Sequence, residues 1–199
     1  MKEDLSMNMN KVVAFLKKEP KDFTKADMIR FVEENEIKMV NFRYVAGDGR
    51  LKTLNFVLNN RAYLEQILSC GERVDGSNIF PAFIHAGSSD MYVIPRFRTA
   101  FVDPFATIPT LSFLCSYFNK DGQPMENSPE YILKKAVKSF NQVTGMDFQA
   151  MGELEYYVIG DKEELYQTPD QKGYHESTPF TKFEEFRTQC MLYISQVGG

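Results

Sequence analysis

The sequence predicts an α+β fold in which short strands and a few helices form one unit from about residue 38 to residue 118. Residues 40–44 alternate apolar and polar side chains, as a half-buried strand does. A Gly47-Asp48-Gly49 turn joins this run to a second apolar run over 51–58, which is the pattern of a β-hairpin. Amphipathic helical segments on either side of the hairpin complete the mixed pattern.

The first 37 residues are expected to form an N-terminal helical extension. A short amphipathic helix is predicted over 12–16, and Pro20 prevents it from continuing. A second helix is predicted to begin after Thr24. The Thr24 side chain can cap this helix, and Asp27 at the third helical position can reciprocate as a capping box.

The remaining elements of the first unit follow the hairpin. A short helix is expected next, then a polar loop at Asp75-Gly76-Ser77-Asn78, then further strands. The helix is placed at 61–68 and the strands at 91–94, 100–102 and 110–117. Taken alone, Asp75 is best interpreted as a loop residue that makes an Asx-turn with Gly76.

A second unit is predicted over 125–199, after a polar, glycine- and proline-containing boundary at 119–124. Its first helix has a serine cap at Ser128, a proline at the first helical position and a closing glycine at Gly145. Apolar residues between 132 and 140 fall on one face of this helix. A last helix is expected over Phe183–Val197.

Composition excludes several classes of function. The chain has 199 residues, 43% of them hydrophobic, which is enough for one large or two small domains with a buried core. The net charge of −4 argues against a nucleic-acid-binding protein. No apolar run is long enough to span a membrane. Three widely spaced cysteines and the absence of an apolar leader favour a cytoplasmic location.

The most informative stretch is Gly152-Glu153-Leu154-Glu155, which continues into the apolar run 156–159. On a strand, side chains two residues apart point to the same face, so Glu153 and Glu155 would project together. Carboxylate pairs of this kind suit a hard divalent cation such as Mg²⁺ or Mn²⁺. On spacing alone, two glutamates on a solvated sheet face explain the pattern better.

The order of the motifs resembles glutamine synthetase over residues 38–199. The resemblance rests on Asp75-Gly76-Ser77, Ser89-Asp90-Met91, Asp103-Pro104-Phe105, the Ser128-Pro129 helix start, Gly152-Glu153-Leu154-Glu155, Gly173-Tyr174 and Arg187 with Cys190-Met191. It implies a β-grasp N-terminal domain over 38–118 and a truncated start of the catalytic α+β domain over 125–199. It also implies ATP-dependent joining of glutamate and ammonia through γ-glutamyl phosphate.

The resemblance assigns roles to individual residues. Glu153 and Glu155 match metal-ligating glutamates, which would hold Mg²⁺ or Mn²⁺ against the phosphates of ATP. Asp75 matches the aspartate that binds ammonium and takes its proton, in a ring where it serves the adjacent subunit's site. Tyr174 matches a tyrosine that lines the ammonium pocket. Asn78 stands where the family often has a serine, and its amide can still hydrogen-bond near ammonium, so it is counted with the ammonium-binding residues.

Three hypotheses about function stay open at this point. The chain is the N-terminal portion of a glutamate–ammonia ligase, a relative that joins glutamate to another amine, or a non-catalytic module that assembles with or regulates a synthetase. Asn78 and the positive charges of Arg96 and Arg98 permit the second hypothesis. Two carboxylates cannot complete two octahedral metal shells, so we expect the 199-residue chain alone to be inactive.

Overall fold

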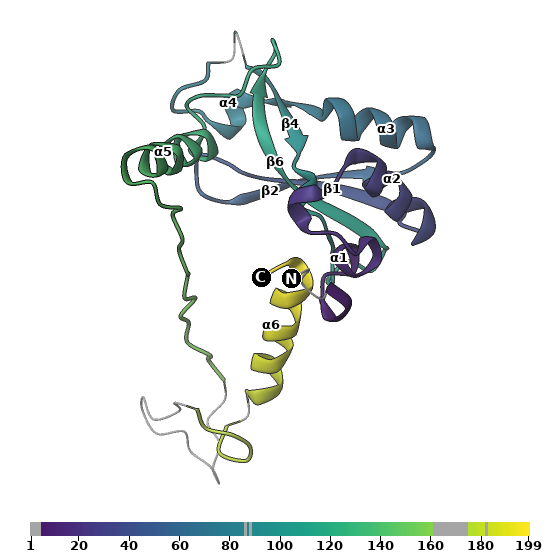
Figure 1. Cartoon of the computed structure of the whole chain (residues 1–199), viewed down its shortest axis with the longest axis vertical. Coiled ribbons are helices and arrows are strands. Elements are labelled where there is room, and N and C mark those ends of the chain that lie inside the picture. Colours follow the sequence, from purple (N-terminus) through teal and green to yellow (C-terminus); the bar gives the residue numbers. More distant parts are fainter. Residues whose placement is uncertain (1–4, 86, 88, 161–174, 182) are drawn as a thin grey trace.

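The computed structural model describes every residue except 1–4, 86, 88, 161–174 and 182. Its described residues contain a six-stranded mixed sheet with the order β2-β1-β6-β4-β3, and β5 pairs with β6 outside this path. The strands are β1 Met39–Val45, β2 Leu51–Val57, β3 Glu72–Asp75, β4 Asp90–Pro95, β5 Phe101–Val102 and β6 Thr110–Asn119. The predicted α+β class is therefore confirmed (Figure 1).

Helices precede, interrupt and follow the sheet (Figure 1). The α-helices are α1 Lys11–Leu16, α2 Lys25–Glu34, α3 Arg61–Cys70, α4 Gly76–Ile79, α5 Pro129–Thr144 and α6 Glu184–Val197, and the 3₁₀ helices are η1 Leu5–Met7, η2 Pro20–Asp22 and η4 Phe97–Thr99. No helix among the described residues combines the length and apolar character needed to cross a membrane.

The predicted hairpin is confirmed, and it lies beside the central strand of the sheet. β1 and β2 pair antiparallel from Met39 opposite Val57 to Val45 opposite Leu51. The turn between them places Gly49 at φ 76°, a left-handed conformation that favours glycine. β1 then pairs parallel with β6, whereas β4 and β5 both run antiparallel to β6.

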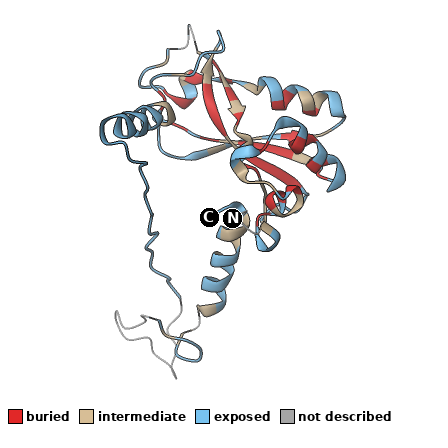
Figure 2. Cartoon of the chain, in the orientation of Figure 1, coloured by how far each residue is buried: buried red, intermediate tan, exposed pale blue. Residues whose placement is uncertain are grey.

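The core lies on one face of this sheet, where β1 and β6 place alternate residues side by side. Val40 is paired with Leu111 and Phe42 with Phe113, and all four are fully buried. Helices α1, α2 and α3 contribute Val12, Met28, Leu64 and other apolar residues to the same cluster. In Figure 2 the buried residues therefore concentrate on the sheet and on the inner sides of these helices.

Local capping signals place the helices where the sequence predicts them. Thr24 and Asp27 form the expected capping box at the start of α2. The Ser128 side chain caps α5, which ends at Gly145 in the left-handed conformation. Both caps satisfy backbone groups that a helix end would otherwise leave without a partner.

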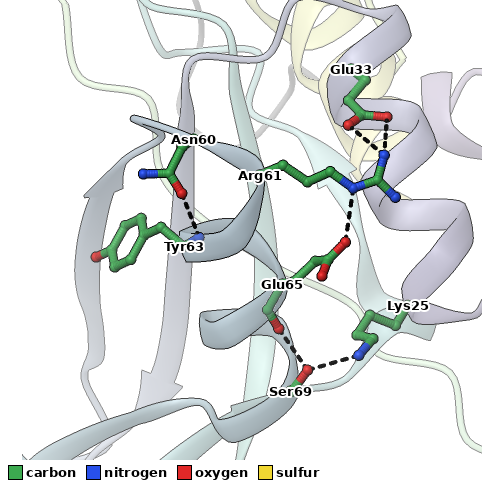
Figure 3. A network of polar contacts seen from close by, with 7 residues as sticks. All are labelled: Lys25, Glu33, Asn60, Arg61, Tyr63, Glu65 and Ser69. Carbon is green, nitrogen blue, oxygen red and sulfur yellow. Dashed lines mark hydrogen bonds and ion pairs between the residues drawn. The ribbon is translucent and has the colours of Figure 1, made fainter.

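A polar network holds α2 against α3 on the surface (Figure 3). Arg61 pairs with Glu65 on its own helix at 2.8 Å and with Glu33 of α2 at 3.0 Å. Lys25 of α2 donates to the Ser69 hydroxyl of α3 at 2.9 Å. These contacts are exposed, so they adjust the packing of two helices whose apolar sides already share the core.

The predicted strand around Glu153 and Glu155 is wrong for this structure. Residues 149–160 form no helix or strand, and they run away from the sheet as a single extended stretch (Figure 1). A strand requires hydrogen bonds from a neighbouring strand, and no described segment pairs with this one. The apolar face predicted for α5 does form, but it is exposed: none of its residues is buried.

Candidate functional site

Asp75 begins a short helical turn, where the sequence predicted a polar loop. The residue ends β3 and is the N-cap of α4. Its Oδ1 accepts hydrogen bonds from the Ser77 backbone N–H at 2.9 Å and from the Ser77 hydroxyl at 2.7 Å. Its Oδ2 accepts from the Asn78 side-chain amide at 2.7 Å. The Asx-turn expected for Asp75 from sequence is therefore present: it spans Gly76 and is closed by the Ser77 N–H.

Close backbone packing fixes the position of this turn. The Gly76 N–H donates to the Ser89 carbonyl at 2.7 Å, and the Gly47 N–H of the hairpin donates to the Ile79 carbonyl at 2.9 Å. A Cβ atom at position 76 would lie 2.8 Å from the Met91 sulfur and 2.9 Å from the Ser89 carbonyl oxygen. Only glycine fits there without displacing its neighbours.

Hydrogen bonding determines the charge state of Asp75. The side chain and backbone of Ser77, together with the side chains of Ser89 and Asn78, lower the pKa of the Asp75 carboxyl. Asp75 is therefore an exposed carboxylate that is ionised at neutral pH. Such a group attracts a small cation, and it is a weaker base than an unperturbed aspartate.

An open groove lies next to the turn and shares a residue with it. Ser89 lines the groove, and its side chain also hydrogen-bonds to Asp75. Polar residues from two further segments line the same groove, among them His85, Asp90 and Asp121. Asp90 stands opposite Asp75 in the β3–β4 register and forms an ion pair with Arg73 at 3.3 Å. The turn thus carries its carboxylate at the rim of a polar groove.

The structure brings together two of the five residues proposed for the site. Asp75, the N-cap of α4, and Asn78 on α4 are joined by a hydrogen bond. Tyr174 lies outside the described residues. Glu153 and Glu155 are exposed and lie in the extended stretch after α5.

The donor chemistry of Glu153 and Glu155 fits a hard divalent cation, because both side chains end in carboxylate oxygens. They supply only part of an octahedral shell. In the described part of the chain, no group of three or more histidine, cysteine, aspartate or glutamate side chains is arranged to hold a metal ion.

Sequence reasoning missed a half-buried ion pair between Arg43 and Asp103. The Asp103 side chain is only 8% exposed, and it also accepts from the Phe105 N–H at 3.0 Å. The second contact fixes the backbone of the turn that follows Asp103. The pairing with Arg43 could not be inferred from sequence, because the two residues are 60 positions apart and meet only because β1 and β5 both pair with β6.

Comparison with known proteins identifies the folded region. Residues 36–120 match the family described as glutamine synthetase, β-grasp domain. This match confirms the resemblance inferred from the ordered motifs, as well as the β-grasp part of the predicted fold.

Curated relatives carry the similarity beyond this domain. A glutamine synthetase from Thermotoga maritima is 28% identical over 174 residues, which cover 85% of this chain and 38% of the relative. A glutamine synthetase from Staphylococcus aureus is 26% identical over 181 residues, which cover 88% of this chain and 40% of the relative. The chain thus spans about 40% of the length of the curated relatives it matches.

Among solved structures, a cryo-EM structure of Plasmodium falciparum glutamine synthetase superposes with a TM-score of 0.52 at 17% identity. The superposition covers 61% of this chain and 23% of that one. This superposition supports the α+β fold described above.

Proposed function

Because residues 36–120 form a glutamine synthetase β-grasp domain, and the chain resembles the N-terminal region of those enzymes, we propose that it is the N-terminal portion of an ATP-dependent glutamate–ammonia ligase. The reaction would join glutamate and ammonium through γ-glutamyl phosphate. The observation that carries the proposal is Asp75, an exposed, ionised carboxylate that Ser77 and Asn78 hold by hydrogen bonds and that pairs in register with Asp90 of the groove wall.

Asp75 is the residue proposed to bind ammonium. Ammonium is a small cation with four N–H donors, and a carboxylate attracts it by charge and accepts its hydrogen bonds. Ser77 and Asn78 already donate to Asp75, so ammonium would compete with one of these donors. Asn78 is the natural candidate, because its amide lies on an exposed side chain beside Oδ2.

The lowered pKa of Asp75 favours cation binding over strong basicity. Asp75 would therefore hold ammonium first. It would then take one proton from ammonium, because ammonium has no lone pair and only the resulting ammonia can attack the carbonyl carbon of γ-glutamyl phosphate and displace phosphate. Tyr174 is proposed to complete the ammonium pocket, on the resemblance alone.

Glu153 and Glu155 are the proposed ligands of Mg²⁺ or Mn²⁺. When bound, the metal would neutralise phosphate charge during phosphoryl transfer. Both side chains would supply carboxylate oxygen ligands, which suit a hard divalent cation. Assembly into a homo-oligomeric ring, with Asp75 serving the adjacent subunit, is part of the same proposal.

A direct test measures ammonium binding by the chain. We expect ammonium chloride to shift the NMR amide signals of Ser77 and Asn78, and Asp75→Asn to abolish these shifts. Asp48→Asn is the matched control, because Asp48 is also an exposed carboxylate of lowered pKa, held in a turn by the Arg50 N–H. Loss of the shifts in both variants would contradict a specific role for Asp75.

A second test places the domain in a complete enzyme. Residues 36–120 would replace the corresponding domain of the Thermotoga maritima relative, and ATP-dependent glutamine formation would be measured. If Asp75 both binds ammonium and accepts its proton, Asp75→Asn should lower kcat/KM for ammonium by about 100-fold or more. An unchanged kcat/KM for ammonium in Asp75→Asn would contradict the assignment of Asp75 as the ammonium-binding residue.

Asn78 supports a second candidate function, a ligase that joins glutamate to an amine other than ammonia. Its amide occupies a position next to the carboxylate, and an alkyl group on the substrate could displace it. The grafted enzyme distinguishes the two functions through its relative kcat/KM for methylammonium and ammonium. A correctly folded graft without activity on either substrate would favour the non-catalytic assembly module.

A further inference from the structure

A groove of about 400 Å³ lies between the sheet and α5, and no residue of the Asp75 turn lines it. It is lined by Lys134, Lys135 and Lys138 of α5 and by residues of β6 and the turn that follows it. Its volume is within the range of small-molecule sites in proteins. None of the residues proposed for the ligase reaction lines this groove.

The charge of the groove is unbalanced. Glu130 is the one carboxylate among the lining residues that the structure describes, so three lysines and one glutamate give a net charge of +2 at neutral pH. Lys134 pairs with Glu130, whose Oε1 also accepts from the Ser116 hydroxyl at 2.6 Å. Lys135 and Lys138 have no ion-pair or hydrogen-bond partner within the described ranges.

Apolar side chains line the remainder of the groove. Tyr131 and Phe118 are half-buried in its wall, and Pro124 is exposed beside them. Flat apolar surfaces of this kind contact an aromatic ring, whereas lysine ammonium groups bind phosphate as point charges. The groove therefore offers one region for a ring and another for an anion.

From this combination, we propose that the groove binds a phosphate monoester carried on an aromatic or heteroaromatic group. A phosphate monoester carries about −1.5 to −2 charges at neutral pH and has three acceptor oxygens, which matches the net charge of the groove and its three ammonium groups. A carboxylate carries one negative charge and would leave the groove positive.

Titration calorimetry of the full chain with phenyl phosphate tests this proposal. Inorganic phosphate, which lacks the ring, and phenol, which lacks the charge, are the two comparison ligands. We expect saturable 1:1 binding of phenyl phosphate, weaker binding of inorganic phosphate and none of phenol. Equal affinity for the two phosphates, or no saturable binding of phenyl phosphate, would overturn the proposal.

The Lys135→Gln/Lys138→Gln double variant should weaken phenyl phosphate binding by about tenfold, because it removes both unpaired charges. Lys11→Gln/Lys21→Gln is the matched control, since it removes two exposed lysines that lie outside the groove. Circular dichroism establishes that both variants keep their helices. An equal loss of affinity for phenyl phosphate in both variants would show that binding depends on overall charge. That result would refute binding in the groove.

Discussion

At the residue scale, the Asp75 turn depends on groups that a motif alone does not reveal. The Asp-Gly-Ser tripeptide predicts a turn, and its two hydrogen bonds to Ser77 are local. The contributions of Ser89 and Met91 are not local, because they reach the turn through the pairing of β3 with β4. The same reason hides the ion pair of Arg43 with Asp103 from sequence reasoning.

Ser77→Ala should raise the pKa of Asp75 toward its ordinary value of about 3.9, since Ser77 supplies the largest lowering contribution. The measurement is an NMR pH titration of the Asp75 carboxyl carbon. A lowered folded-state pKa stabilises the fold above the unfolded pKa, and this stabilisation is lost as pH falls through the folded value. The variant should therefore lose less stability than the parent on acidification below about pH 4. Ser69→Ala, far from Asp75, should leave the titration unchanged.

Gly76→Ala should destabilise the fold by about 1–3 kcal/mol, because the added methyl group meets a backbone carbonyl as well as two side chains. Gly152→Ala provides the comparison, since nothing lies within 4 Å of a Cβ at that position. Urea denaturation of both variants measures the difference. Equal stability of the two variants would show that the Gly76 turn relaxes more readily than its packing indicates.

At the element scale, local signals predicted structure well and long-range pairing decided the rest. The α2 and α5 helices were predictable because their caps and apolar periodicity are contained in contiguous residues. Residues 152–159 have the composition of a strand but no hydrogen-bonding neighbour among the described segments. Composition determines whether a segment can be a strand, whereas a partner determines whether it becomes one.

Two contacts made by α2 can be compared by how much each contributes to the free energy of unfolding. Thr24→Ala removes the cap of α2 and should cost about 1 kcal/mol of stability. Arg61→Gln removes exposed ion pairs to Glu33 and Glu65 and should cost about 0.5 kcal/mol or less. Urea midpoints at low and high salt check both values, because salt screens only the ion pairs. A larger loss for Arg61→Gln would mean that the network in Figure 3 holds the two helices together more strongly than surface pairs usually do.

At the scale of the whole molecule, burial is distributed unevenly along the chain. The buried apolar residues among those described lie between Val12 and Tyr117, and neither α5 nor α6 buries any residue. Most of the large exposed apolar residues belong to the other part, on α5, on the extended stretch and on α6. Figure 2 colours these segments almost entirely as exposed or intermediate. Exposed apolar surface of this extent is characteristic of regions that pack against another protein surface.

Hydrogen exchange should distinguish the part of the chain that contains the buried core from the exposed part. In dilute solution, amides of residues 149–160 should exchange at nearly unprotected rates, while those of β1 and β6 exchange only through global unfolding. Chymotrypsin should cut first at Leu154, Tyr156 or Tyr157, which are all exposed. If copies of the chain assemble through this surface, raising the concentration should slow both exchange and cleavage in this stretch. Protection that is already complete at the lowest concentration would instead require an intramolecular partner for the stretch, which contradicts its exposure here.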